Sequence, residues 1–102
     1  MLSMVEEKMD AISGFCRRFG VVKLDLFGSA TSDAFDDLRS DLDFAVSFAA
    51  CSPQEHYENY FGLMEGLEHL FQRPVDLVEY SALRNPYFIT NLEASRKALY
   101  AA

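Results

Sequence analysis

The sequence predicts an α/β fold in which a small β-sheet carries helices on only one of its faces. Segments with helical spacing alternate with short apolar segments, in the order α-β-loop-β-α-β-α. The chain has 102 residues, 50% apolar and 25% charged, which is enough for one core and too few for two. Residues 1–102 are therefore expected to form a single domain. One strand also has an apolar face and a face that begins with carboxylates, which disfavours a sheet covered on both sides.

The first predicted helix ends at Gly20, a residue type that commonly terminates helices. Its apolar positions recur at steps of three and four residues: Val5, Met9, Ile12, Phe15, Cys16 and Phe19. The β-branched and apolar residues 21–27 follow and stop at Gly28-Ser29, which predicts a strand. Residues 30–40 are polar and are predicted to form a loop or a turn of helix.

Residues 41–48 give the clearest strand pattern, because apolar and polar side chains alternate along them. One face carries Leu42, Phe44, Val46 and Phe48. The other face carries Asp41, Asp43, Ala45 and Ser47. Helices are therefore expected to cover only the apolar face.

The second half of the chain predicts a helix, a strand and a final helix. Ser52, Pro53 and Glu55 combine an N-cap, a proline at the first helical position and a capping-box glutamate. The helical stripe that follows is read as core: Tyr57, Tyr60, Phe61, Met64, Leu67, Leu70 and Phe71. Pro74 ends this helix and opens a strand at 75–80. Asn85-Pro86 starts the last helix, whose expected inner stripe is Phe88, Ile89, Leu92 and Leu99.

Charge and composition exclude several classes of function. The chain has 9 basic and 16 acidic residues, a net charge of −7, which disfavours direct binding of nucleic acid or anionic membranes. No apolar run approaches the roughly 18 to 20 residues that span a bilayer, and the N-terminus lacks the pattern of a signal peptide. Cys16 and Cys51 are interpreted as buried free thiols in a reducing cytosol, so a cytoplasmic location is expected.

Asp41 and Asp43 are the first candidates for a functional site. On a strand their Cα atoms lie about 6.6 Å apart with both side chains on one face, where they repel unless a cation or a proton intervenes. Oxygen ligands of this kind suit a hard ion such as Mg²⁺. Asp76, one strand over, shares a face with Val78 and would complete a site for two ions, as used in phosphoryl and nucleotidyl transfer.

A phosphate-binding turn is expected beside these carboxylates. Gly28 lets the backbone approach a phosphate closely, and Ser29 offers an N–H and a hydroxyl group. Each feature alone is generic, because Asp-x-Asp is often a solvated strand and Gly-Ser is usually only a turn. Their order along the chain is the informative observation.

In this order the motifs resemble those of a known family. Leu26-Phe27-Gly28-Ser29, followed by Ser40-Asp41-Leu42-Asp43-Phe44, closely resembles the signature of the minimal nucleotidyltransferases, the smallest branch of the DNA polymerase beta superfamily. Val75-Asp76-Leu77-Val78 looks like the family's third-aspartate strand. Asn85-Pro86-Tyr87 and the closing Leu99-Tyr100-Ala101-Ala102 are similar to the tail of a common subgroup. The resemblance covers nearly the whole chain.

The resemblance implies a small mixed sheet of the polymerase beta palm type, with helices on one side. It also implies metal-dependent transfer of a nucleoside monophosphate from a nucleoside triphosphate, with ATP as the expected donor. Asp41 and Asp43 would hold two Mg²⁺ ions, with Mn²⁺ as an alternative. Asp76 would hold the catalytic ion and help take a proton from the attacking hydroxyl group. Gly28 and Ser29 would hold the triphosphate.

The resemblance further implies a partner protein. Such enzymes are often paired with a small helical HEPN-type toxin and in some pairs silence it by attaching adenylate to a tyrosine, which is an antitoxin role. The short acidic chain fits this, because its acceptor must be small or be presented by another subunit. Association with further copies of the chain is left open. Transfer to a small molecule such as an aminoglycoside is disfavoured, because no second domain is expected.

The alternative is an inactive or weakly active family member that neutralises or scaffolds a partner by contact alone. The missing arginine and Asp33 favour it, whereas the three intact aspartates oppose it. The chain departs from the pattern of the family in three ways. Eleven residues separate Ser29 from Asp41, where much of the family has ten, although one subgroup shares the longer gap. The arginine that often follows the Gly-Ser motif is missing from Thr31-Ser32-Asp33. Asp33 also stands where glycine is usual and would place negative charge beside a triphosphate.

Other polar residues receive more ordinary interpretations. Asp25 is expected to be a solvated or paired surface residue rather than part of the acidic site. Asp33, Asp36 and Asp37 are expected to lie in a solvated loop. Arg39 is either a phosphate contact or a surface ion pair. His56 and His69 are thirteen residues apart on one helix and are expected at or near the surface, not around one metal.

Overall fold

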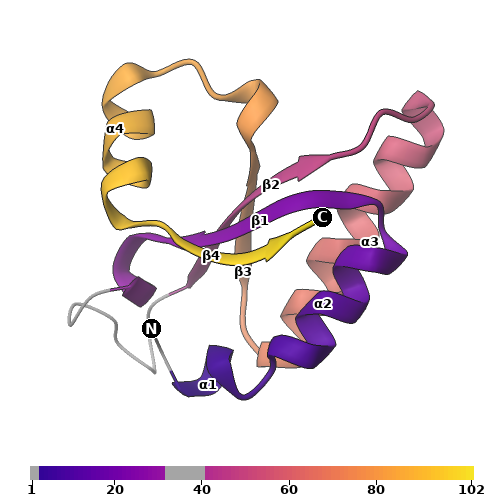
Figure 1. Ribbon diagram of the computed structural model, residues 1–102, viewed down its shortest axis with the longest axis horizontal. Coiled ribbons are helices and arrows are strands. Elements are labelled where there is room, and N and C mark those ends of the chain that lie inside the picture. The colour runs from indigo at the N-terminus through magenta and orange to yellow at the C-terminus, as the bar shows by residue number, and fades with distance from the viewer. Residues whose placement is uncertain (1–2, 32–40) are drawn as a thin grey trace.

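The computed structural model describes residues 3–31 and 41–102, which form one four-stranded sheet with helices around it (Figure 1). The strands are β1 (Val21–Phe27), β2 (Leu42–Phe48), β3 (Val75–Glu79) and β4 (Lys97–Ala101). The helices are α1 (Ser3–Glu6), α2 (Met9–Arg18), α3 (Pro53–Phe71) and α4 (Pro86–Ser95), with short 3-10 helices η1 (Gly28–Thr31) and η2 (Tyr80–Ala82). No helix in these residues is both long and apolar enough to cross a bilayer.

The sheet is mixed and has the order β3-β2-β1-β4. Strand β1 pairs antiparallel with β2 and β4, whereas β2 and β3 run parallel and are connected through α3. The predicted class, a small mixed sheet with helices, is confirmed. The parallel pairing of β2 with β3 places acidic residues of the two strands opposite each other.

The C-terminal strand β4 was not predicted. Leu99 lies seven residues after Leu92, so it fits the periodicity of α4, but that helix ends at Ser95 and Leu99 is a buried residue of β4. The open edge of β1 supplies the backbone partners for these last residues. A strand this short shows too little alternation to be recognised without its partner.

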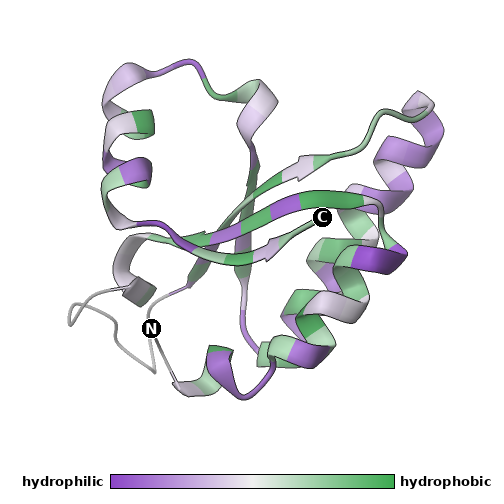
Figure 2. Cartoon of the chain, in the orientation of Figure 1, coloured by the Kyte–Doolittle hydropathy of each residue, from purple (hydrophilic) through white to green (hydrophobic). Residues whose placement is uncertain are grey.

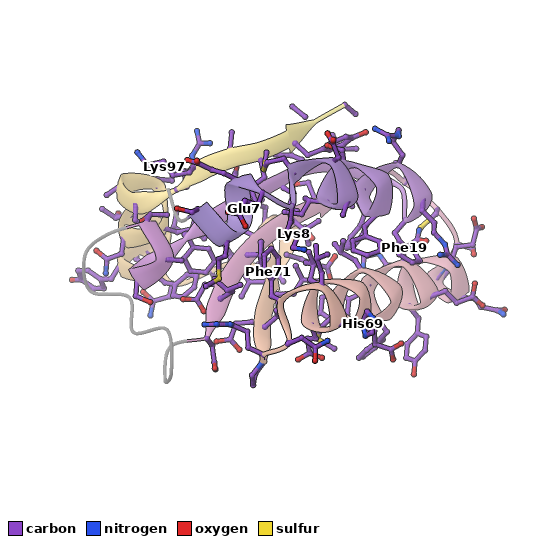
Figure 3. The ribbon with its side chains drawn as sticks, turned by 90° about the horizontal axis from the view of Figure 1, so that it is seen from below. Glu7, Lys8, Phe19, His69, Phe71 and Lys97 are labelled. Atoms are coloured by element: carbon purple, nitrogen blue, oxygen red, sulfur yellow. The ribbon has the colours of Figure 1, made fainter. Side chains whose placement is uncertain are left out.

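One face of the sheet carries the main core. Its strand residues are Leu24, Leu26, Leu42, Phe44, Val46, Val75 and Leu77, as the alternation predicts. They pack against Ile12, Cys16, Leu63, Leu67 and Phe71 of α2 and α3, and the rings of Phe44 and Phe71 stack at 6.2 Å. Figure 2 shows hydrophobic residues along the strands and along α2 and α3, and Figure 3 shows Phe19 between these two helices.

The first helix is broken where a continuous one is predicted. Lys8 has backbone angles of φ −108° and ψ 11°, which separate α1 from α2. The break turns α1 so that Val5 reaches the core with no exposed surface. Helix α3 follows its predicted start: the Ser52 hydroxyl group accepts from the Glu55 N–H and donates to the Glu55 carboxylate. It ends at Phe71, and Gln72 adopts the left-handed conformation before Pro74.

Two predictions of buried residues are wrong, one for the aromatic residues of α3 and one for Cys51. Tyr57 and Phe61 lie outside the core stripe of α3 and are 64% and 38% exposed. The buried stripe of α3 runs through Leu63, Leu67 and Phe71, and Tyr60 packs against it, whereas Tyr57 and Phe61 lie to one side of it. Cys16 is buried and free, and burial raises the pKa of its thiol to about 12. Cys51 is also free but exposed, because it lies in the loop before α3.

The prediction that helices cover only the apolar face is wrong for one helix, because α4 packs on the opposite face and covers part of it. Helix α4 lies apart from α2 and α3 (Figure 1) and places Leu92 against Phe27 and Ala45 in a small second cluster. Asp25, Asp43 and Asp76 alternate with the core residues of their strands and therefore belong to this face. The final helix begins as predicted, since the Asn85 side chain accepts from the N–H groups of Tyr87 and Phe88.

Candidate active site

Two carboxylates face each other across neighbouring strands. In the parallel pairing of β2 with β3, Asp43 is directly opposite Asp76. Asp43 is partly buried, Asp76 is exposed, and both line a cavity of about 320 Å³. Phe27 and Phe88 form an aromatic side of the same cavity, with ring centroids 5.8 Å apart. The sequence-predicted partnership of Asp43 with Asp76 is thus present in the fold.

Burial and neighbouring carboxylates both raise the pKa of Asp43. Burial raises its pKa from 3.8 to about 6, with further contributions from a hydrogen bond to Asp76 and from the charges of Asp76 and Asp41. Asp41 is exposed at the start of β2 and does not line the cavity, so it acts on the pair from its margin. Within residues 3–31 and 41–102, no three acidic, histidine or cysteine side chains form a ready metal cluster. The structure therefore shows a carboxylate pair with a third acid nearby.

The glycine turn lies against this pair. Gly28 follows β1 with φ +75°, a conformation that favours glycine, and Phe27 is paired with Asp43 in the sheet. A Cβ atom at position 28 would lie 2.5 Å from Asp43 Oδ2. The absent side chain lets the Asp43 carboxylate pack directly against the backbone of the turn. Ser29 lies in the same turn and is partly buried.

Sequence analysis missed Ser95, which closes on this turn from the end of α4. Its hydroxyl oxygen accepts a hydrogen bond of 3.1 Å from the Gly28 N–H, while the Thr31 hydroxyl group donates to the Gly28 carbonyl. The contact joins residues 67 positions apart, so no local pattern could reveal it. Any anion that binds the Gly28 N–H must displace Ser95.

The donors present suit a hard cation. They are carboxylate oxygens held on one face of a sheet. The pKa of Asp43 is raised by burial first and then by its hydrogen bond to Asp76 and by neighbouring negative charge, and a bound cation would relieve the repulsion between the carboxylates. Mg²⁺ commonly takes one or two protein carboxylates and completes its shell with water and phosphate oxygens, so a pair is sufficient.

Removing the charge of Asp43 is expected to stabilise the metal-free protein. The folded-state pKa is raised, so the carboxyl group favours folding fully below its unfolded value of 3.8, and this contribution is lost as the pH rises through about 6. After discounting for partial exposure, Asp43→Asn should increase the free energy of unfolding by about 1 kcal/mol near neutral pH. Urea unfolding in metal-free buffer from acidic to neutral pH measures this difference. A variant less stable than the wild type at neutral pH would contradict the assignment.

Asp25 is fully buried, and its prediction as a surface residue is wrong. The Tyr80 hydroxyl group donates to Asp25 Oδ2, with Lys23 Nζ at 3.5 Å and Arg96 NH1 at 3.6 Å. Among the described residues, Asp25 Oδ1 has no hydrogen-bond partner. Tyr80 and Arg96 come from the ends of β3 and α4, so their approach could not be read from the sequence around Asp25.

Of the remaining candidate residues, the structure describes the two histidines but not those between residues 32 and 40. His56 is partly exposed, with Nε2 2.8 Å from Glu79 Oε1, and His69 is exposed, so neither shares a metal site with the other. The predictions for Asp33, Asp36, Asp37 and Arg39 fall on residues outside the described ranges.

Comparison with known proteins gives a family and several structural relatives. A family model described as "Nucleotidyltransferase domain" matches residues 8–99, whereas a search of curated proteins finds no match. A solved protein proposed to be a minimal nucleotidyltransferase is 25% identical, with a TM-score of 0.71 over 90% of this chain and 89% of that chain.

Two further relatives occur in structures of toxin–antitoxin assemblies. One structure is a tri-AMPylated Shewanella oneidensis HEPN toxin in complex with MNT antitoxin, where the match has 20% identity, a TM-score of 0.64 and coverage of 96% of this chain and 73% of that chain. The other is a toxin–antitoxin with AMP-PNP, with 21% identity, a TM-score of 0.66 and coverage of 92% and 73%. At these identities the likeness establishes the fold.

Proposed function

Because the chain belongs to the nucleotidyltransferase domain family, we propose that it transfers AMP from ATP to a hydroxyl group of an acceptor protein, with a divalent cation. The observation that carries this proposal is the pairing of Asp43 with Asp76 in one cavity, with the Gly28 turn packed against Asp43. A fold without catalytic use has no need to hold two carboxylates against each other, since their repulsion is destabilising.

Each residue has a distinct proposed role. Asp43 and Asp76, with Asp41 at the margin, would hold Mg²⁺ or Mn²⁺, which would neutralise the carboxylates and the triphosphate. The Gly28-Ser29 turn would receive the triphosphate, with the Gly28 N–H exchanging Ser95 for a phosphate oxygen. The acceptor oxygen forms a bond to the α-phosphorus as the bond to pyrophosphate breaks. The exposed Asp76 carboxylate takes the proton of the acceptor.

The proposed acceptor is a tyrosine of a HEPN-type protein. Relatives of the same fold occur in toxin–antitoxin structures, one of which holds an AMPylated toxin. The net charge of −7 supports a protein acceptor over a nucleic acid, whose phosphates would be repelled. On this view the chain is the antitoxin of a pair and acts in the cytoplasm.

Incubation with labelled ATP, Mg²⁺ and the protein that co-purifies with this chain or is encoded by a neighbouring gene tests the proposal. Intact-mass spectrometry is expected to show adenylate on the partner, and peptide mapping to place it on a tyrosine. Asp43→Asn and Asp76→Asn should abolish the modification, whereas Asp10→Asn, an exposed change on α2, should leave it intact. A stable complex whose partner stays unmodified would contradict adenylyl transfer.

That last outcome would favour a second candidate function, neutralisation of a partner by contact alone. The specific observations on its side are the absence of a ready three-ligand cluster within the described residues and the use of the Gly28 N–H by Ser95. The missing arginine after the Gly-Ser motif points the same way. If the Asp43→Asn variant still neutralised the toxin, this second function would be established.

A further inference from the structure

A second cavity lies where the start of α3 meets the end of β3. Its volume is about 370 Å³, and it is lined by Pro53, His56, Tyr57, Tyr60, Phe61 and Glu79. Tyr60 lines this cavity and also the one that holds Asp43 and Asp76. The two cavities are therefore neighbours on either side of one tyrosine ring.

The aromatic walls of this cavity are preorganised. The ring of Phe61 lies 4.7 Å from that of Tyr57 and 5.1 Å from that of Tyr60, measured between centroids. The Tyr60 hydroxyl group donates to the Leu77 carbonyl at 2.6 Å, which fixes its ring against β3. Tyr57 and Phe61 nevertheless remain 64% and 38% exposed, although their apolar surface favours contact with a partner.

One carboxylate completes the cavity. Glu79 is 21% exposed in its side chain, and His56 Nε2 lies 2.8 Å from Glu79 Oε1, which holds the carboxylate in the wall. No lysine or arginine lines the cavity. An apolar occupant would strip water from the Glu79 oxygen that His56 does not contact, and an anion would be repelled by the carboxylate. A planar cation can instead stack on the rings and donate hydrogen bonds to the carboxylate.

We propose that this cavity binds the guanidinium group of an arginine on the partner protein. Its use in docking the acceptor rests on the proposed adenylyl transfer, because the shared Tyr60 places a bound segment beside Asp43 and Asp76. The strongly acidic chain favours a basic segment in the same way. The outer edge of β3 is covered by α3, since Glu68 accepts from the Val75 N–H and Tyr60 donates to Leu77. Side-chain capture in the cavity therefore fits better than addition of a strand to this edge.

An NMR titration of the full chain with Nα-acetyl-arginine amide tests the site without nucleotide or Mg²⁺. Saturable shifts are expected at Tyr57, Tyr60, Phe61 and Glu79, and the neutral isostere Nα-acetyl-citrulline amide should not produce them. Glu79→Gln, which can still accept from His56, should weaken binding by about fivefold or more. Tyr57→Ala, a change at an exposed side chain, should weaken it comparably. The matched control Tyr87→Ala, 82% exposed on α4 and outside the cavity, should bind like the wild type.

Equal shifts with the citrulline probe, no saturable shift with the arginine probe, or full affinity in Glu79→Gln and Tyr57→Ala would each overturn the inference. Failure is distinguishable from failure of the proposed function, because the probe needs neither ATP nor a partner. Normal adenylyl transfer without probe binding would overturn the arginine site and leave the proposed function standing. Probe binding without adenylyl transfer would leave a cation-binding site on a chain of another function.

Discussion

Alanine at position 28 is expected to disrupt the candidate active site. The left-handed conformation of Gly28 costs an L-residue about 1–2 kcal/mol, so Gly28→Ala should lower the free energy of unfolding by at least that amount. The new Cβ atom would also lie 2.5 Å from Asp43 Oδ2. The carboxylate, as the mobile end of a side chain, is expected to move away from Asp76. Adenylyl transfer should therefore be lost even where the variant remains folded.

Gly14→Ala is the matched control for this change. Gly14 lies within α2, and an added Cβ atom would meet nothing within 4 Å. Because alanine is the better helix former, this variant should be more stable by about 0.5–1 kcal/mol and keep its activity. Urea unfolding and the mass-spectrometric transfer assay together compare the effects of the two substitutions on stability and on activity. If the Gly28→Ala protein kept the stability and the adenylyl-transfer activity of the wild type, the turn would not determine the position of the Asp43 carboxylate.

The second large effect is expected at Asp25. Asp25→Ala leaves the Tyr80 hydroxyl group, Lys23 and Arg96 without their shared carboxylate at a position with no exposed surface. Lys23 and Arg96 are partly exposed and can regain water, so the expected loss of stability is about 2–3 kcal/mol, less than for a fully enclosed pair.

Asp41→Ala, the same substitution at an exposed position, should change stability by less than about 0.5 kcal/mol. Tyr80→Phe should reproduce part of the Asp25→Ala loss, and the double variant should lose less than the sum, because the two side chains share one hydrogen bond. Chemical denaturation of the wild type, the three single variants and the double variant gives these differences in the free energy of unfolding. Additive effects of Asp25→Ala and Tyr80→Phe would show that the bond contributes nothing to stability.

Local sequence signals predicted the elements that carry the site. The alternation at 41–48, the cap at Ser52 and the Asn85-Pro86 start each depend on neighbouring residues, and each is found in the structure. The opposition of Asp43 and Asp76 could be anticipated because parallel strands joined by a helix align side chains of the same face.

Features set by distant contacts could not be predicted in this way. Strand β4 forms only because β1 offers a free edge, and Ser95 reaches Gly28 only because α4 returns to the end of β1. Asp25 was misread for the same reason, since Tyr80 and Arg96 cover it from other elements. Tyr57 and Phe61 share the periodicity of the core stripe, but the way α3 lies on the sheet buries Leu63, Leu67 and Phe71 and leaves these two rings exposed.

Thermal unfolding with Mg²⁺ and a non-hydrolysable ATP analogue asks whether Asp43 and Asp76 hold a cation together with nucleotide. A ligand that binds only the folded state raises the melting temperature, so the wild type should gain stability when both additives are present and little with either alone. Asp43→Asn and Asp76→Asn should lose this gain, and Asp10→Asn should retain it. The same gain in Asp43→Asn, or none in the wild type at any nucleotide concentration, would contradict a cation and nucleotide site at this pair.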